Sequence, residues 1–195
     1  MKRWVNFIGL SVLMVLFLAG CSKPQIEMDA AKTAVEAAVT EGADIYAKPE
    51  LELLQADLTK AMDAVAAEDQ KIFKSFGDAK VMLSAVATKA NELKATIPGR
   101  KEEARQAAAA AIEEATAAVE EAKTLLAGAP KGKGTKADIA AMTADLQGLE
   151  GMLAELQTKM VNEDYLGAKE SAGVIKEKAA GVSEQVRLAI EKVRR

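Results

Sequence analysis

Apolar residues recur along the chain in alternating steps of three and four. Such steps place side chains on one face of an α-helix, as at the a and d positions of a heptad. No run alternates with the period of two that marks a strand. The pattern therefore predicts an all-α protein with six amphipathic helices, over residues 28–45, 51–72, 79–97, 108–125, 139–160 and 168–193.

The last three segments repeat the apolar positions of the first three. Aligned pairs include Val35 with Ala115, Leu58 with Leu146, Val86 with Ile175 and Phe76 with Tyr165. Any two heptad helices align in some register, but the paired start signals Ser75 and Asp164 favour a true duplication. We expect two tandem antiparallel three-helix units with alanine-rich heptad seams, over residues 21–98 and 99–195.

Turn residues agree with these boundaries. Pro49 suits the first turn of the second helix, and Ser75 and Thr135 begin the capping boxes of the third and fifth. Ile97-Pro98-Gly99 predicts a break between the units, since a proline inside a helix costs about 3 kcal/mol. A single kinked helix is the alternative. The fourth and fifth helices are joined by a longer loop, Gly128–Thr135.

The seams differ in side-chain size. Alanine is densest in the fourth helix, whereas leucine and methionine fill the fifth, so truncating Leu149 or Leu153 to alanine is expected to cost about 2–5 kcal/mol. Glu68 stands where the second unit has Leu156. It is either a polar notch that sets register or binds a ligand, or a frayed last turn with its carboxylate in water. We favour the frayed turn.

The amino terminus has the composition of a secretory signal peptide. Lys2 and Arg3 precede an apolar run from Trp4 to Ala19, and small residues lead to Cys21, the single cysteine. The run is shorter than the roughly 20 residues that a membrane span needs. We predict a lipoprotein signal peptide over residues 1–20. The alternative is an uncleaved anchor helix.

Leu18-Ala19-Gly20-Cys21 resembles the lipobox of bacterial lipoproteins. The resemblance implies cleavage before Cys21, a diacylglyceryl thioether on its sulfur and an N-acyl group, with palmitate among the chains. In the sorting pattern of such proteins, Ser22 implies the outer membrane, on its periplasmic face, whereas an aspartate would imply retention at the inner membrane. Three acyl chains anchor a protein almost permanently.

Composition argues against most chemistry. The chain has no histidine, and a lipid on Cys21 would leave no thiol for a disulfide, a metal or a nucleophile. We therefore expect no enzyme activity, no metal and no cofactor, with carboxylate catalysis as an open alternative. Cleavage removes Lys2 and Arg3, which moves the net charge from −3 to −5. This acidic body predicts no nucleic-acid partner.

Two other patterns have simpler interpretations. Gly128–Thr135 is superficially similar to a phosphate loop, but Lys133 is followed by glycine and the loop follows a helix. Its basic tip would suit anionic headgroups. Glu113-Glu114 and Glu120-Glu121 have the spacing of a metal site, yet a solvated helix face is the better interpretation.

Residues 21–97 resemble an uncharacterised family of alanine-rich helical bacterial lipoproteins, a domain of unknown function. The resemblance is carried by a tether with proline, spaced alanines, an Ala-x-Pro turn, a leucine helix and a last alanine-spaced helix. Here these are Pro24, Ala31 to Ala38, Ala47-Lys48-Pro49, Leu54 to Ala64 and Ala79 to Ala90. The family implies no activity and no functional residue.

The sequence thus predicts a lipid-anchored, non-enzymatic helical lipoprotein that faces the periplasm. It would act as a scaffold or accessory subunit of an envelope assembly, with an envelope protein as partner. The alternative is a periplasmic carrier or chaperone whose alanine-lined groove opens for an apolar ligand. A homo-oligomer formed through the seams stays open as well.

Overall fold

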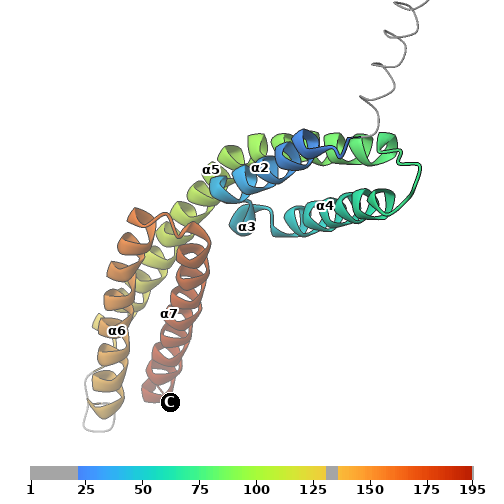
Figure 1. Ribbon diagram of the computed structural model, residues 1–195. Coiled ribbons are helices and arrows are strands. Elements are labelled where there is room, and N and C mark those ends of the chain that lie inside the picture. The colour runs from blue at the N-terminus through green and yellow to red at the C-terminus, as the bar shows by residue number, and fades with distance from the viewer. Residues whose placement is uncertain (1–21, 131–135, 195) are drawn as a thin grey trace, which may run out of the picture. The chain divides into compact units, whose positions relative to one another are not determined.

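The computed structural model describes residues 22–130 and 136–194 of the chain. Within these ranges every regular element is an α-helix, which confirms the all-α prediction. The helices are α2 (Gln25–Glu41), α3 (Ala43–Tyr46), α4 (Lys48–Asp69), α5 (Gly77–Ala127), α6 (Lys136–Val161) and α7 (Tyr165–Arg194), as labelled in Figure 1.

The chain divides into two compact units between Arg100 and Lys101, beside the predicted boundary at residue 98. Unit 1 contains α2, α3, α4 and the first part of α5, and unit 2 contains the rest of α5 with α6 and α7. Each unit has its own cluster of buried apolar side chains. The predicted signal peptide, residues 1–20, lies outside the described residues.

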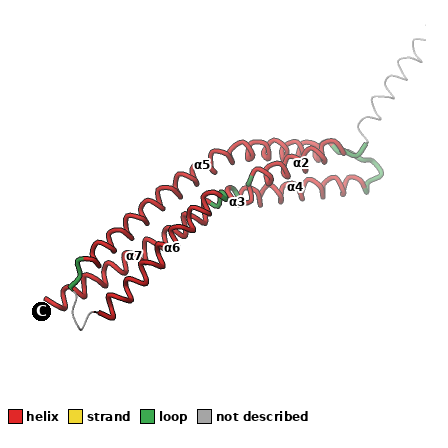
Figure 2. The backbone as a smooth tube through the Cα atoms, turned by 90° about the vertical axis from the view of Figure 1, so that its left-hand side faces the viewer, coloured by secondary structure: helices red, strands yellow, loops and turns green. Residues whose placement is uncertain are grey.

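Ion pairs give the helix directions in unit 1. Lys80 near the start of α5 lies 3.2 Å from Glu27 near the start of α2. Arg100, farther along α5, lies 2.7 Å from Glu50 in the first turn of α4. Helix α4 therefore runs antiparallel to both α2 and α5, as the backbone trace in Figure 2 shows.

The same pattern of directions holds in unit 2. Lys176 and Arg187 of α7 pair with Glu114 and Glu121 of α5, at 2.7 and 2.8 Å, in the same order along both helices. These two helices are therefore parallel. Helix α6 follows α5 and precedes α7 in the chain, and the turn after α6 leads directly into α7. Helix α6 therefore runs antiparallel to both.

The predicted break at Ile97-Pro98-Gly99 is wrong, because Pro98 lies inside α5. Proline cannot donate the hydrogen bond that would close this turn of the helix. Packing on either side holds the helix nonetheless. Ile97 is fully buried in unit 1, and Arg100 donates hydrogen bonds to the Tyr46 carbonyl at 3.1 Å and to Glu50 at 2.7 Å. Tertiary contacts outweigh the local cost.

The first predicted helix is in fact two. Gly42, which the heptad pattern placed within a single seam, has a φ of 109° and ends α2. Its N–H bonds to carbonyls of the last turn of α2, as in other left-handed helix caps. A side chain here would be strained by the backbone and would meet Tyr46 at 3.3 Å. Pro49 lies in the first turn of α4, as predicted.

The two aligned start signals behave differently. Asp164 caps α7, because its carboxylate accepts a hydrogen bond from the Gly167 N–H at 3.0 Å. The predicted box at Ser75 is wrong, because α5 begins at Gly77 and its N-cap is Phe76: the first bond of the helix runs from the Lys80 N–H to the Phe76 carbonyl at 2.9 Å, and the Ser75 N–H bonds to Glu68. The other predicted box begins at Thr135, outside the described residues.

Burial supports a repeat between the third and sixth predicted helices. Six aligned pairs are buried in both units, namely Phe76 with Tyr165, Ala79 with Ala168, Leu83 with Ala172, Val86 with Ile175, Ala90 with Ala179 and Ile97 with Val186. In the seventh pair, Val182 is buried and Leu93 is half-buried. The first and fourth helices match in another register than predicted. Ala31 and Ala38 are buried, and they match Ala115 and Ala122, which are buried as well. The predicted partner of Ala38 was Ala118, which is only half-buried.

The interpretation of Glu68 as a carboxylate in water is wrong. Its side chain is 23% exposed, and it accepts hydrogen bonds from the Lys71 ammonium group and, at 3.4 Å, from the Ser75 N–H. The Lys71 contact is the main reason that the pKa of Glu68 is lowered. Glu68 therefore fastens the loop between α4 and α5. In unit 2, Leu149 is buried as predicted, whereas Leu153 is half-buried.

Candidate functional site

The predicted lipidation residues lie at the edge of the described chain. Leu18, Ala19, Gly20 and Cys21 fall outside the described residues, and Ser22 is exposed. Pro24 is buried, and α2 begins at Gln25. The Lys23 ammonium group lies 3.5 Å from the Asp69 carboxylate at the end of α4. Only residues 22–24 therefore separate Cys21 from the packed body of unit 1.

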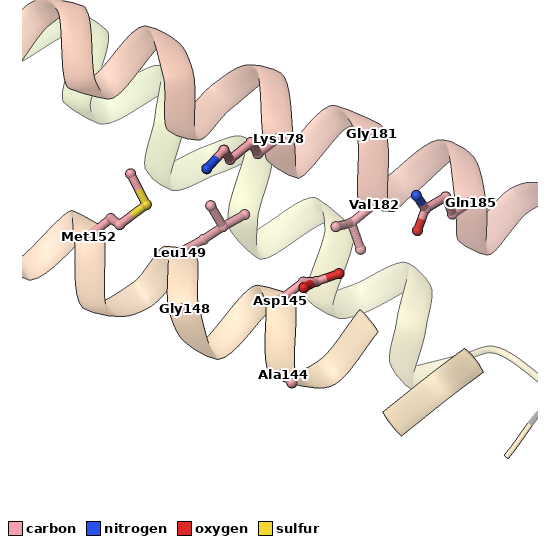
Figure 3. Close-up of a pocket in the computed structure, with 9 residues that line it drawn as sticks. All are labelled: Ala144, Asp145, Gly148, Leu149, Met152, Lys178, Gly181, Val182 and Gln185. Atoms are coloured by element: carbon pink, nitrogen blue, oxygen red, sulfur yellow. The ribbon is translucent and has the colours of Figure 1, made fainter. Parts of the chain in front are cut away.

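A groove lies between α6 and α7 of unit 2 (Figure 3). Its volume is about 460 Å³, within the usual size of small-molecule sites. We call it the α6–α7 groove, and it is lined by Ala144, Asp145, Gly148, Leu149, Met152, Lys178, Gly181, Val182 and Gln185.

Two glycines make room for this groove. Gly148 lies on α6 and Gly181 on α7, and a Cβ added to either would meet no atom within 4 Å. Glycine inside a helix costs about 1 kcal/mol relative to alanine. Both glycines therefore lower the stability of their helices in the same groove. The side chains of Leu149, Met152 and Val182 form its apolar walls.

The charged residues of the groove have counterparts in unit 1. Asp145 and Lys178 align in the repeat with Asp57 and Lys89. In unit 1 these two form an ion pair of 2.7 Å in a groove of about 350 Å³, and the hydrogen bond from Lys89 lowers the pKa of Asp57.

Asp145 and Lys178 are arranged differently in unit 2. Both are exposed, and within the described residues they form no ion pair with each other. Figure 3 shows Lys178 directed toward Met152, whereas Asp145 lies nearer Val182. One cation and one anion therefore flank an apolar hollow, an arrangement that suits binding of a ligand with an apolar body and a polar end.

Three of the four paired glutamates of α5, namely Glu114, Glu120 and Glu121, lie in ion pairs. Glu114 accepts a hydrogen bond from Lys176 at 2.7 Å, which lowers the pKa of Glu114. Glu120 and Glu150 both lie 2.8 Å from Lys123 and raise the pKa of that lysine. Across the described part of the chain, no group of three or more histidine, cysteine or acidic side chains is placed to hold a metal ion.

The ion pairs predict acid sensitivity. Hydrogen bonds from Arg105 and Gln106 lower the pKa of Glu102 from 4.5 to about 2, and Arg100 lowers that of Glu50. Because these pKa values are lower in the folded chain, the stabilisation is present above the unfolded value of 4.5 and is lost as the pH falls toward 2. We expect the urea midpoint, measured by circular dichroism, to be steady from pH 7 to 5 and to fall below pH 4.5. A constant midpoint down to pH 2 would contradict these pairings.

The groove glycines give a second prediction. Gly148→Ala and Gly181→Ala are each expected to stabilise their helix by about 0.5–1 kcal/mol, because alanine has the higher helix propensity and its methyl group meets open space. Thermal and urea unfolding measure the gain. Gly167→Ala is the contrasting variant, since its Cβ would collide with the Asp164 carboxylate. Loss of stability in the groove variants would show that the hollow is filled.

The loop after α5 is described only in part. The Ala129 N–H bonds to the Leu126 carbonyl at 3.1 Å, and Ala129 is buried in unit 2. Residues 131–135 lie outside the described residues, so the interpretation of Gly128–Thr135 as a basic tip stays a prediction.

The described residues define an all-α protein of two helical units with a surface groove in each. Comparison with known proteins adds no relative: no family model, no curated protein and no solved structure matches the chain. In the described part, none of the helices combines the length and apolar character needed to cross a membrane.

Proposed function

We propose that this protein is a lipid-anchored lipoprotein of the bacterial outer membrane that faces the periplasm. The observation that carries the proposal is the lipobox at Leu18-Ala19-Gly20-Cys21, followed by Ser22. The short tether supports it, because Pro24 is already buried against unit 1 and α2 begins one residue later. The anchor would thus hold the folded body close to the lipid headgroups.

We further propose that the body is a non-enzymatic scaffold or accessory subunit of an envelope assembly. Unit 2 exposes several large apolar side chains that a protein partner would cover, including Val161, Leu166, Val174 and Leu188. Three of these four side chains lie on α7 and Val161 ends α6, and exposed apolar side chains that form a patch are typical of interaction surfaces. The partner that fits this surface is another envelope protein, or a second copy of the chain.

In-cell crosslinking followed by mass spectrometry tests the scaffold. We expect one envelope protein, or the chain itself, to be crosslinked to unit 2 in stoichiometric amount. Val174→Glu should abolish that crosslink, whereas Val81→Glu, on an exposed site of unit 1, should leave it intact. Crosslinks of equal yield in both variants, or none to unit 2, would overturn the scaffold.

A carrier of an apolar ligand is the second candidate, and the α6–α7 groove favours it. The groove combines open space at Gly148 and Gly181 with apolar walls and one charge of each sign. Mass spectrometry of lipids extracted from the purified protein tests this function. A carrier should release a bound lipid in near-stoichiometric amount, and Gly181→Leu should remove it by filling the groove.

A further inference from the structure

One end of unit 1 exposes large apolar side chains. The loop between α4 and α5 contains Ile72, which is 94% exposed, and Phe73, which is 91% exposed. Ile26, in the first turn of α2, is 83% exposed. Two adjacent large apolar side chains fully in water have no role in the core, which in this region is supplied by Val65 and Phe76.

Lysines surround these apolar residues. Lys71 pairs with Glu68, and Lys74 lies 2.6 Å from Asp69. Lys23 lies 3.5 Å from the same Asp69 carboxylate. Lys71 and Lys74 flank Ile72 and Phe73 in the sequence, although the carboxylates at this end, Glu27 and Asp78 included, balance the lysines in charge. Large exposed apolar side chains flanked by lysines are typical of surfaces that enter the headgroup region of a membrane.

The start of the described chain lies at the same end. Asp69 contacts both Lys23 and Lys74, so the residues just after Cys21 lie against the loop between α4 and α5. Figures 1 and 2 both show the start of α2 beside that loop. An extended chain spans about 3.4 Å per residue. A lipid on Cys21, two residues before Lys23, would therefore be attached within about 7 Å of the backbone of Lys23.

We propose that the membrane tip, defined as Ile26, Lys71, Ile72, Phe73 and Lys74, inserts into the bilayer surface that holds the lipid of Cys21. The inference rests on the lipid anchor of the proposed function. Ile72 and Phe73 enter the boundary between headgroups and acyl chains, while the lysines contact lipid phosphates. The lipid alone would leave unit 1 free to turn about the short tether that precedes Lys23. Insertion of the tip adds a second attachment and sets this end of unit 1 on the membrane.

A single tryptophan tests the insertion. The only tryptophan of the chain is Trp4, which cleavage would remove, so Phe73→Trp places a unique fluorophore in the tip. The purified, acylated protein, from which residues 1–20 have been cleaved, is reconstituted in phosphatidylethanolamine–phosphatidylglycerol vesicles whose acyl chains are brominated. We expect a blue-shifted emission and a loss of about half of its intensity relative to vesicles without bromine, because the tip side chains reach the acyl boundary.

Leu53→Trp is the matched control, since Leu53 is 70% exposed and lies near the opposite end of α4. Its emission should be unaffected by bromine. If an acylated Phe73→Trp protein floats with the vesicles but is quenched no more than Leu53→Trp, the tip proposal is overturned while the anchor stands. A blue shift without quenching would show that a protein surface covers the tip, which also overturns it. Absence of the acyl mass would overturn the anchor itself.

Discussion

Replacing Cys21 with serine is expected to abolish acylation and to remove the protein from the outer membrane. Serine has no thiol to carry the diacylglyceryl group that the lipobox resemblance implies. Burial of each CH₂ of an acyl chain is worth about 0.8 kcal/mol, so loss of the chains removes nearly all of the binding energy. Residues 1–20 should stay attached to the variant. Density-gradient fractionation and intact-mass spectrometry measure both effects.

Ser22→Asp is the matched control for this experiment. It leaves Cys21 in place, so the acyl mass should be unchanged, while the sorting pattern predicts retention at the inner membrane. If Cys21→Ser protein fractionates with the outer membrane as the wild type does, the lipid anchor is wrong. If the wild-type protein retains residues 1–20, the uncleaved anchor helix becomes the correct interpretation.

Truncating Phe76 to alanine is expected to destabilise unit 1 by about 3–5 kcal/mol. Phe76 is 1% exposed and is among the largest fully buried side chains of the described residues. It lies at the start of α5 in the same buried cluster as Val65 of α4 and Ala31 of α2, so its loss leaves a cavity in the core of unit 1. Because the chain has two units, hydrogen exchange measured by mass spectrometry is the suitable readout.

Phe73→Ala provides an internal comparison three residues away. Phe73 is almost fully exposed, so the same substitution should leave the exchange of unit 1 in water unchanged. The loss of protection in Phe76→Ala should be confined to unit 1, because unit 2 has a core of its own. Equal effects of the two substitutions would contradict the placement of these side chains.

The periodic pattern predicted the helices well where it was long and uninterrupted. The register from Phe76 to Ile97 and from Tyr165 to Val186 matches the observed burial at every seam position but Leu93, which is half-buried, because a heptad seam must face the core of its unit. The start of α4 at Lys48-Pro49 and the capping of α7 by Asp164 were also predictable, since both depend on local backbone geometry.

Local signals misled where distant contacts decide. Pro98 was expected to end a helix, but burial of Ile97 and the hydrogen bonds of Arg100 to residues of α3 and α4 keep α5 continuous. The carboxylate of Glu68 was predicted to lie in water. Its contacts with Lys71 and Ser75 could not be predicted, because they depend on how the loop after α4 turns back. No seam position identifies the α6–α7 groove, because Gly148 and Gly181 become a hollow only when their two helices are placed side by side.

The sequence by itself determined the helical class and the burial register of most helices, and it contains the lipobox-like motif on which the proposed anchor rests, because each depends on the spacing of residues that are close along the chain. Only the tertiary structure decided that Pro98 stays within a helix, that glycines of α6 and α7 form one groove, and that Ile72 and Phe73 lie beside the residues that follow Cys21. These features join residues far apart in sequence, and their free energy comes from packing and ion pairs that exist only once the helices have assembled.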